Sequence, residues 1–106
     1  MRLEEDRKHK RRLEDAKNLA SRIMHLHYCE HDVEGVTALF SSQFSWFGAG
    51  EEEYATGRET CTDRFFKYKG AIPKCNIWDE EYDVICPLKD LYVVTGRMWI
   101  ATDPSS

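Results

Sequence analysis

Hydrophobic residues recur at spacings of three and four along residues 13–27, which predicts an amphipathic helix from residue 2 to about residue 30. The apolar positions of this stripe are Leu13, Ala16, Leu19, Ala20, Ile23, Met24 and Leu26 or His27. After Met1, the first turns contain only one large aliphatic side chain, Leu3. We therefore expect residues 1–12 to form a charged N-terminal extension of the helix, with little apolar surface to pack against the rest of the chain.

The pattern changes from helical to extended in the next part of the chain. Asp32 is a favourable cap for a short second helix. Residues 43–47 alternate, with Phe44 and Trp46 on the same side, and this period of two predicts a strand. Residues 48–53 consist of glycine, alanine and glutamate, so we expect them to end the strand and to form a loop in water.

A third helix and two long strands are predicted after this loop. Thr56 and Glu59 have the spacing of a capping box, so we expect a helix that begins there and ends at Gly70. Residues 76–86 alternate and predict a strand, which residues 87–90 connect to a last strand at residues 91–102. In the first of these strands, we expect one face to be covered by the rest of the protein and the other to be exposed to water. The covered face carries Trp78, Tyr82, Val84 and Cys86, and the exposed face carries Asp79, Glu81 and Asp83.

This order of elements resembles the front half of the NTF2-like superfamily and of its SnoaL-like members. The resemblance covers about residues 13–103 and depends on short features: His31-Asp32 after the first helix, the Phe44-Ser45-Trp46 strand, Gly57-Arg58-Glu59 before the third helix and Thr95-Gly96-Arg97 in a late strand. It implies an α+β fold in which helices pack on a curved antiparallel sheet and enclose a conical pocket. Residues 13–106 would form this domain.

The superfamily normally continues with two further long antiparallel strands. We therefore expect the domain to be incomplete at its C-terminus, with an open sheet edge beside residues 91–102 that invites pairing with another chain. The resemblance also implies a place at the N-terminus of a larger bacterial signalling protein, of the sensor kinase or diguanylate cyclase type. In that case the downstream signalling domain belongs to the same chain.

Composition and charge narrow the classes of function. With 106 residues, 42% of them hydrophobic and 32% charged, the chain has the composition of one globular domain. Its net charge of −4 argues against general binding to nucleic acid. The longest apolar run falls short of the roughly 20 residues of a membrane helix, so we expect a cytoplasmic protein without membrane insertion. Four cysteines without CxxC spacing fit reduced thiols in that compartment.

The positions at which the superfamily performs catalysis carry unsuitable residues here. Its steroid isomerases place a general-base carboxylate at the end of the first strand and a tyrosine on the first helix. By the resemblance, these positions fall near Gly48 and Ile23, and neither side chain can transfer a proton. We therefore predict no catalytic residue. A histidine–acid pair stays open as an alternative, with the candidates His25, His27, Asp79 and Asp83.

Metal-ligating side chains gather at the end of the first helix, at His25, His27, Cys29 and His31. On a regular helix the pairs His25/Cys29 and His27/His31 point about 160° apart, so a single ion could use only one pair. No further ligand has the spacing that would complete a set of four. We expect neither a metal nor another cofactor.

The candidate pocket-lining residues of the predicted cone are Trp46, Gly48, Tyr82, Arg97 and Trp99. The alternative is that the aromatic rings fill the core, as we expect for Phe44 and Phe66, and that Arg97 forms a salt bridge to Glu80. The predicted function is a non-catalytic module for ligand sensing or dimerisation. Its expected partners are an apolar or aromatic small molecule and a second copy bound through the sheet. A small SnoaL-like isomerase, cyclase or hydro-lyase is the alternative function.

Overall fold

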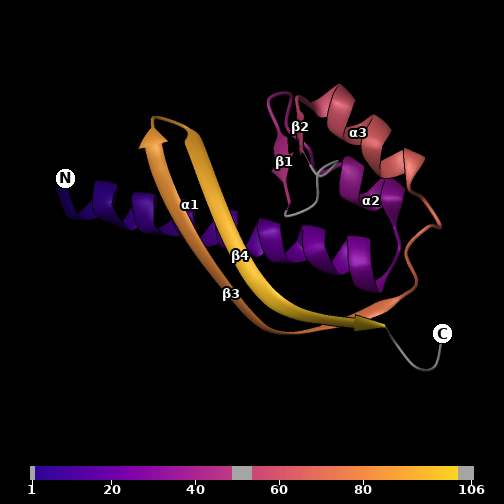
Figure 1. Cartoon of the computed structure of the whole chain (residues 1–106). Helices are drawn as coiled ribbons and strands as arrows, with labels where there is room; N and C mark the ends of the chain where they lie inside the picture. Colours follow the sequence, from indigo (N-terminus) through magenta and orange to yellow (C-terminus); the bar gives the residue numbers. More distant parts are fainter. Residues whose placement is uncertain (1, 49–53, 103–106) are drawn as a thin grey trace.

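The computed structural model describes residues 2–48 and 54–102 (Figure 1). The elements follow in the order α1 (Arg2–Met24), the π-helix η1 (His25–Cys29), α2 (Val33–Thr37), β1 (Ser45–Phe47), β2 (Tyr54–Thr56), α3 (Arg58–Lys67), β3 (Cys75–Leu88) and β4 (Leu91–Thr102). The α+β class that the sequence predicts is confirmed. Within the described residues the strands form two separate antiparallel pairs, β1 with β2 and β3 with β4.

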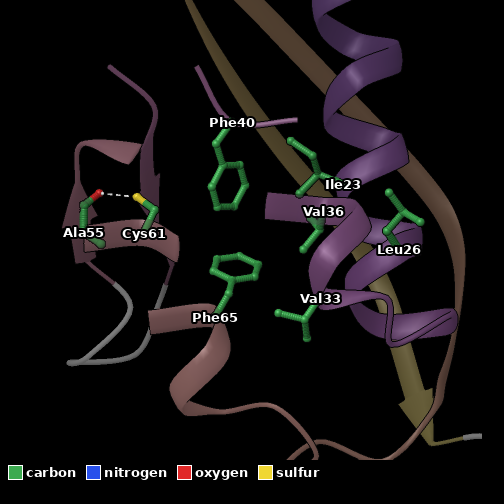
Figure 2. Close-up of a cluster of buried hydrophobic side chains, with 8 residues drawn as sticks. All are labelled: Ile23, Leu26, Val33, Val36, Phe40, Ala55, Cys61 and Phe65. Atoms are coloured by element: carbon green, nitrogen blue, oxygen red, sulfur yellow. Dashed lines mark hydrogen bonds between the residues drawn. The ribbon is translucent and has the colours of Figure 1, made fainter. Parts of the chain in front are cut away.

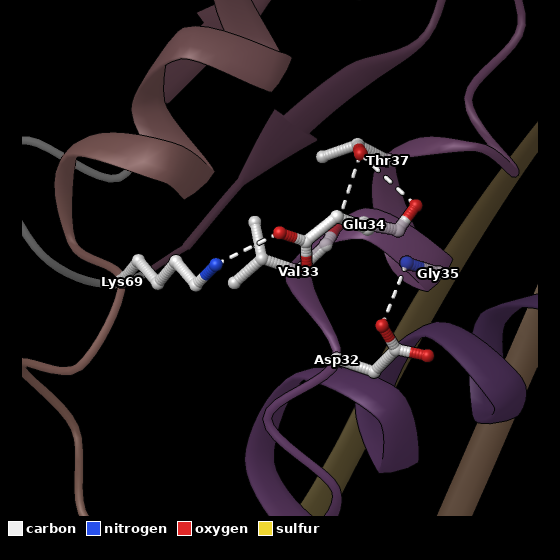
Figure 3. A network of polar contacts seen from close by, with 6 residues as sticks. All are labelled: Asp32, Val33, Glu34, Gly35, Thr37 and Lys69. Atoms are coloured by element: carbon white, nitrogen blue, oxygen red, sulfur yellow. Dashed lines mark hydrogen bonds and ion pairs between the residues drawn. The ribbon is translucent and has the colours of Figure 1, made fainter.

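The long N-terminal helix and the short helix after it form as predicted. α1 and η1 follow each other without a break, and the first turns of α1 project away from the other elements (Figure 1). Leu3 in these turns is 72% exposed. The Asp32 carboxylate accepts a hydrogen bond of 2.9 Å from the backbone N–H of Gly35 (Figure 3). This bond satisfies one of the free donors at the start of α2, and the missing side chain of Gly35 leaves room for the carboxylate.

Replacing Asp32 with alanine is expected to lower the free energy of unfolding by about 0.5–2 kcal/mol, because α2 then loses its cap. Asparagine caps helices about as well as aspartate, so Asp32→Asn is the matched control and is expected to stay close to the wild type. Urea denaturation followed by circular dichroism measures both values. Equal losses in the two variants would show that the charge of Asp32, rather than the cap, stabilises the fold.

The main core lies between the end of the long helix, α2, the β1–β2 pair and α3 (Figure 2). Its buried members are Ile23, Leu26, Val33, Val36, Phe40, Ala55, Cys61 and Phe65. Phe40 and Phe65 meet edge to face with their ring centroids 5.2 Å apart, and Phe44 stacks on Phe40 at 4.1 Å. Among the described residues, no member of this core comes from β3 or β4.

The start of α3 and the strand before it differ from the prediction. Gly57, with a φ of 87°, occupies the N-cap position of α3, and no side chain caps the helix there. The predicted capping box of Thr56 and Glu59 is therefore wrong. Thr56 instead ends β2, where it pairs with Ser45 of β1. The pattern did not predict β2, because a strand of three residues is too short to establish a period of two.

β3 and β4 form a long curved hairpin that crosses α1 (Figure 1). The turn between them is Lys89-Asp90, shorter than the predicted connection, and Asp90 adopts a φ of 61° that aspartate tolerates in turns. We call the face toward α1 the inner face; it carries the half-buried residues Ile77, Glu80, Tyr82, Val84, Val94 and Met98. The outer face carries Trp78, Glu81, Ile85, Val93, Arg97 and Trp99, which are exposed.

The molecule is elongated. Its principal extents are 51 × 29 × 24 Å. Its radius of gyration is 15.1 Å, against roughly 13 Å for a compact domain of this length. The long helix and the hairpin extend beyond the main core and account for this shape (Figure 1). In the part of the chain that the structure describes, no helix combines the length and the apolarity that crossing a membrane requires.

Candidate functional site

Glu80 faces the long helix from β3, next to a bulge in that strand. The register with β4 shifts between Trp78 and Glu81, and Asp79 adopts a φ of 54°. A bulge adds one residue to a strand, so the side chains that follow it exchange faces. Glu80 and Tyr82, two residues apart, share the inner face, whereas Trp78, before the bulge, lies on the outer face and is 46% exposed. The prediction that Trp78 shares the covered face with Tyr82 is wrong for this reason.

The π-helix η1 supplies the partner of Glu80. A π-helical turn holds more residues than an α-helical turn and changes the direction of the side chains along it. His25, the first residue of η1, contacts Glu80 of β3. His27 lies in the other direction, with its ring 4.8 Å from Phe65 and 6.5 Å from Trp46. η1 therefore contacts both the hairpin and the main core.

Three side chains bind the carboxylate of Glu80, and with it they form what we call the Glu80 network. The Ser21 hydroxyl donates a hydrogen bond of 2.9 Å to Oε1, and the Tyr82 hydroxyl donates one of 2.8 Å to the same oxygen. His25 Nε2 lies 2.8 Å from Oε2. The side chain of Glu80 is 23% exposed, so this network lies partly out of water between the helix and the hairpin.

The surroundings hold Glu80 ionised and Tyr82 protonated. Burial acts to raise the pKa of Glu80. The hydrogen bonds from His25, Tyr82 and Ser21 outweigh burial, and the pKa is lowered overall. Burial raises the pKa of Tyr82 far above its ordinary value, and the hydrogen bond to the Glu80 carboxylate adds to this effect. Near neutral pH the network therefore contains a carboxylate that accepts and a phenol that donates.

This chemistry suits a structural connection better than proton transfer. A general base needs a pKa close to the working pH and a free path to the substrate proton. The pKa of Glu80 is lowered, and both of its oxygens already face donors of the protein. Tyr82 holds its proton too firmly to act as a general acid. The network therefore joins α1 and η1 to β3 and offers no group poised for catalysis.

The described residues also form two surface hollows, one of which borders the network. A hollow of about 610 Å³ at the bulge is lined by Asp79, Glu80, Glu81, Arg97, Met98 and Trp99. Another of about 240 Å³, between α2 and α3, is lined by Glu34, Thr37, Ala38, Arg58, Thr62 and Phe66. In the first hollow, Arg97 Nε donates a hydrogen bond of 2.7 Å to Glu81, which lowers the pKa of that carboxyl. The salt bridge from Arg97 to Glu80, the alternative that the sequence left open, does not form.

The five predicted pocket residues lie in two different places. Arg97 and Trp99 both line the 610 Å³ hollow, and Tyr82 belongs to the Glu80 network of the same hairpin. Trp46 packs beside the main core with its ring 5.5 Å from Phe65, and Gly48 follows β1 as an exposed residue. The structure thus brings three of the candidates to the hairpin and leaves the other two on the β1–β2 side.

The sequence analysis missed Ser21 and the central role of Glu80. It left a histidine–acid pair open for His25, but with Asp79 or Asp83 as the acid. A signal for Glu80 was present, because Asp79, Glu80 and Glu81 are consecutive acids within an alternating strand. Such a run must place an acid on the covered face or bend the strand. Here Glu80 lies on the covered face, and the strand also forms a bulge beside it.

The histidines and cysteines at the helix end lie in different surroundings. In the described part of the chain, no group of three or more histidine, cysteine, aspartate or glutamate side chains is arranged to hold a metal ion. His25 is engaged by Glu80 instead. The four cysteines are free thiols. Burial raises the pKa of Cys29, and the proximity of Cys75 raises it further.

Comparison of the chain with models of known protein families, with curated proteins and with solved structures finds no match. The resemblance to NTF2-like domains therefore stays a prediction from the sequence. A functional proposal for this chain has to rest on its own geometry.

Proposed function

We propose that this chain is a non-catalytic association module, and that it pairs with a second copy of itself through the outer edge of β4. The observation that supports the proposal is that this edge of β4 has no neighbouring strand among the described residues. Within the described residues, the twelve-residue strand β4 pairs only with β3. The backbone N–H and C=O groups on the other side of an edge strand are a template for a further strand.

The two edges of the hairpin differ in how well they are protected. Proteins discourage association at an edge strand with charged residues, proline and bulges. β3 has all of these: the acids Asp79, Glu80, Glu81 and Asp83, the bulge beside them and Pro87. β4 has no proline, and its only charged residue, Arg97, is paired with Glu81. This asymmetry favours β4 over β3 as the side on which another chain adds.

The outer face of the hairpin carries exposed apolar side chains that could contact one another across a pair of β4 strands. Trp78 and Trp99 are opposite each other in the register, and so are Ile85 and Val93. These four side chains are between 41% and 64% exposed. A two-stranded hairpin alone is only marginally stable in water. Antiparallel pairing of two β4 strands is a symmetric contact that produces four strands and brings the two apolar faces side by side.

The resemblance noted in the sequence supports the same class of function. An NTF2-like domain in a longer bacterial signalling protein would bring two output domains together when its sheets pair. Ligand sensing is the second form of this proposal, and the 610 Å³ hollow supports it, because Arg97 and Trp99 offer a guanidinium and an exposed ring beside each other. The Glu80 network, in which both carboxylate oxygens already contact side chains of the protein, favours these functions over a SnoaL-like enzyme.

The association is tested by the mass of the protein in solution. We expect analytical ultracentrifugation to find twice the chain mass of 12.4 kDa at high concentration and the single mass on dilution. Val93→Lys, on β4, is expected to weaken the dimer at least about tenfold, which corresponds to about 1.4 kcal/mol. Ile85→Lys places the same charge on the same face of β3 and is the matched control, for which we expect a smaller effect.

Each other outcome is informative. Equal weakening by Val93→Lys and Ile85→Lys would indicate that the outer faces stack, and it would contradict pairing through the β4 edge. A single mass of 12.4 kDa at every concentration would remove the proposal of self-association. Circular dichroism of both variants ensures that neither change has unfolded the chain.

A further inference from the structure

The β3–β4 hairpin is attached to the rest of the molecule on one side only. It packs on α1 and η1, and none of its residues belongs to the main core. Residues 68–74 connect it to α3, and this connection contains Gly70 with a φ of 82°. Among the described residues of the hairpin, only Cys75, at the start of β3, is buried. Apolar burial alone therefore holds most of the hairpin weakly.

Polar contacts supply much of the remaining attachment. The Glu80 network joins the middle of β3 to Ser21 and His25. At the far end, Arg12 lies 3.7 Å from Asp90 of the hairpin turn, but both side chains are more than half exposed. Exposed ion pairs of this kind contribute little to stability. The partly buried, charge-assisted contacts of Glu80 are the stronger ones.

Two costly features of the backbone meet at this network. A π-helical turn and a β-bulge are both less favourable than the regular structures that they interrupt, and both are enriched at functional sites. Here the π-helix begins at His25 and the bulge contains Asp79, next to Glu80. One irregularity lies on the helix and the other on the strand, and each contributes one member of the same contact.

We propose that the Glu80 network is an acid-sensitive latch, which holds the β3–β4 hairpin on the long helix near neutral pH and releases it when Glu80 is protonated. Release separates the hairpin from α1 and η1 while the main core stays folded. This inference is independent of the self-association proposed above, because it concerns the inner face of the hairpin and not the edge of β4.

The groups around Glu80 determine the direction of the pH dependence. From α1 the carboxylate faces the Ser21 hydroxyl, from η1 it faces His25 and the Cys29 thiol, and on β3 it faces Tyr82. The charged residues that line the neighbouring hollow with Glu80 are Asp79, Glu81 and Arg97, of which Arg97 is paired with Glu81. A protonated His25 still attracts an ionised Glu80, so release awaits protonation of the carboxylate itself.

The lowered pKa of Glu80 determines whether acid strengthens or weakens the docking of the hairpin. A group whose pKa is lower in the docked state than in the free state stabilises docking above the free value. This contribution is lost as the pH falls through the free value, about 4.3 for glutamate, toward the pKa in the docked state. The latch is therefore closed near neutral pH and opens in the acid range.

Hydrogen–deuterium exchange of the full chain, measured by mass spectrometry, tests the latch. In Glu80→Gln at pH 7 we expect the peptides of β3 and β4 to exchange about 10- to 100-fold faster than in the wild type, whereas those of α2 and α3 keep their protection. Acidification to pH 4 is expected to accelerate hydrogen exchange in the wild-type hairpin, after correction for the intrinsic exchange rate. It should have little further effect on exchange in Glu80→Gln.

Two further variants serve as a control and as an intermediate case. Glu81→Gln removes the neighbouring carboxylate on the outer face and is expected to behave as the wild type. Tyr82→Phe retains the ring but removes one of the donors to Glu80, so its hairpin is expected to exchange at an intermediate rate. Unchanged exchange of the hairpin in Glu80→Gln would overturn the proposal. Equal loss of protection in hairpin and core, in Glu80→Gln and Tyr82→Phe alike, would overturn it too, because it would mean that the chain opens as one unit.

Discussion

Replacing Phe65 with alanine is expected to lower the free energy of unfolding by about 3–5 kcal/mol, which is the usual cost of removing a buried phenylalanine. Phe65 is 7% exposed and its ring contacts those of Phe40, Trp46 and His27. Figure 2 shows it pointing from α3 into the main core. A domain of this size has a total stability of only about 5–15 kcal/mol, so the variant should be partly unfolded at 37 °C.

The neighbouring residue provides the control for this prediction. Phe66 lies on another side of α3 and is 42% exposed, so Phe66→Ala is expected to cost less than about 1 kcal/mol. Urea denaturation followed by tryptophan fluorescence measures both variants, and Trp46 reports directly on the packing around Phe65. Similar losses for the two variants would contradict the orientation of α3 in the core.

Replacing Gly96 with alanine is expected to cost about 1–3 kcal/mol, although an alanine fits the backbone of a strand. Gly96 is opposite Tyr82 in the register, and a Cβ atom at this position would lie 2.7 Å from two ring carbons of that tyrosine. The ring covers the glycine, so the added methyl group would have to displace it. Displacement would also break the hydrogen bond from Tyr82 to Glu80.

A double-mutant cycle isolates this contact. In the background of Tyr82→Ala the ring is absent, so the further change Gly96→Ala is expected to cost close to nothing. Thermal or urea denaturation of the two single variants and the double variant gives the coupling energy between the two positions. If Gly96→Ala costs the same in both backgrounds, the loss comes from the strand itself and not from the tyrosine ring.

The long, strongly periodic elements could be predicted from the sequence. The first helix, the Asp32 cap and the last strand at residues 91–102 are confirmed, because each repeats its pattern over many residues or depends on a well-defined local interaction. β2 was not predictable, because it is three residues long. The placement of Phe66 in the core was wrong: only Cys61 and Phe65, four residues apart, are buried on α3.

The candidate site was less accessible to sequence reasoning than the fold. Tyr82 was singled out, but its partner Glu80 was not, although strict alternation places Glu80 on the same face as Tyr82, because a charged side chain is not expected on a covered face. The bulge at Asp79, which moves Trp78 to the outer face, was not predicted either, because a regular alternating pattern does not show where a strand gains a residue. His25 and Glu80 are 55 residues apart, and no local pattern reports a contact over such a distance.

The separation of the main core from the hairpin has a consequence for the order of folding during synthesis. Every member of the core lies between Ile23 and Phe65, so the ribosome completes this set before it makes β3. The hairpin closes through a two-residue turn and depends on contacts near in sequence. Chains with mostly local contacts fold quickly. We therefore expect the core to form while translation continues, with the hairpin docking on the finished helix as the last step.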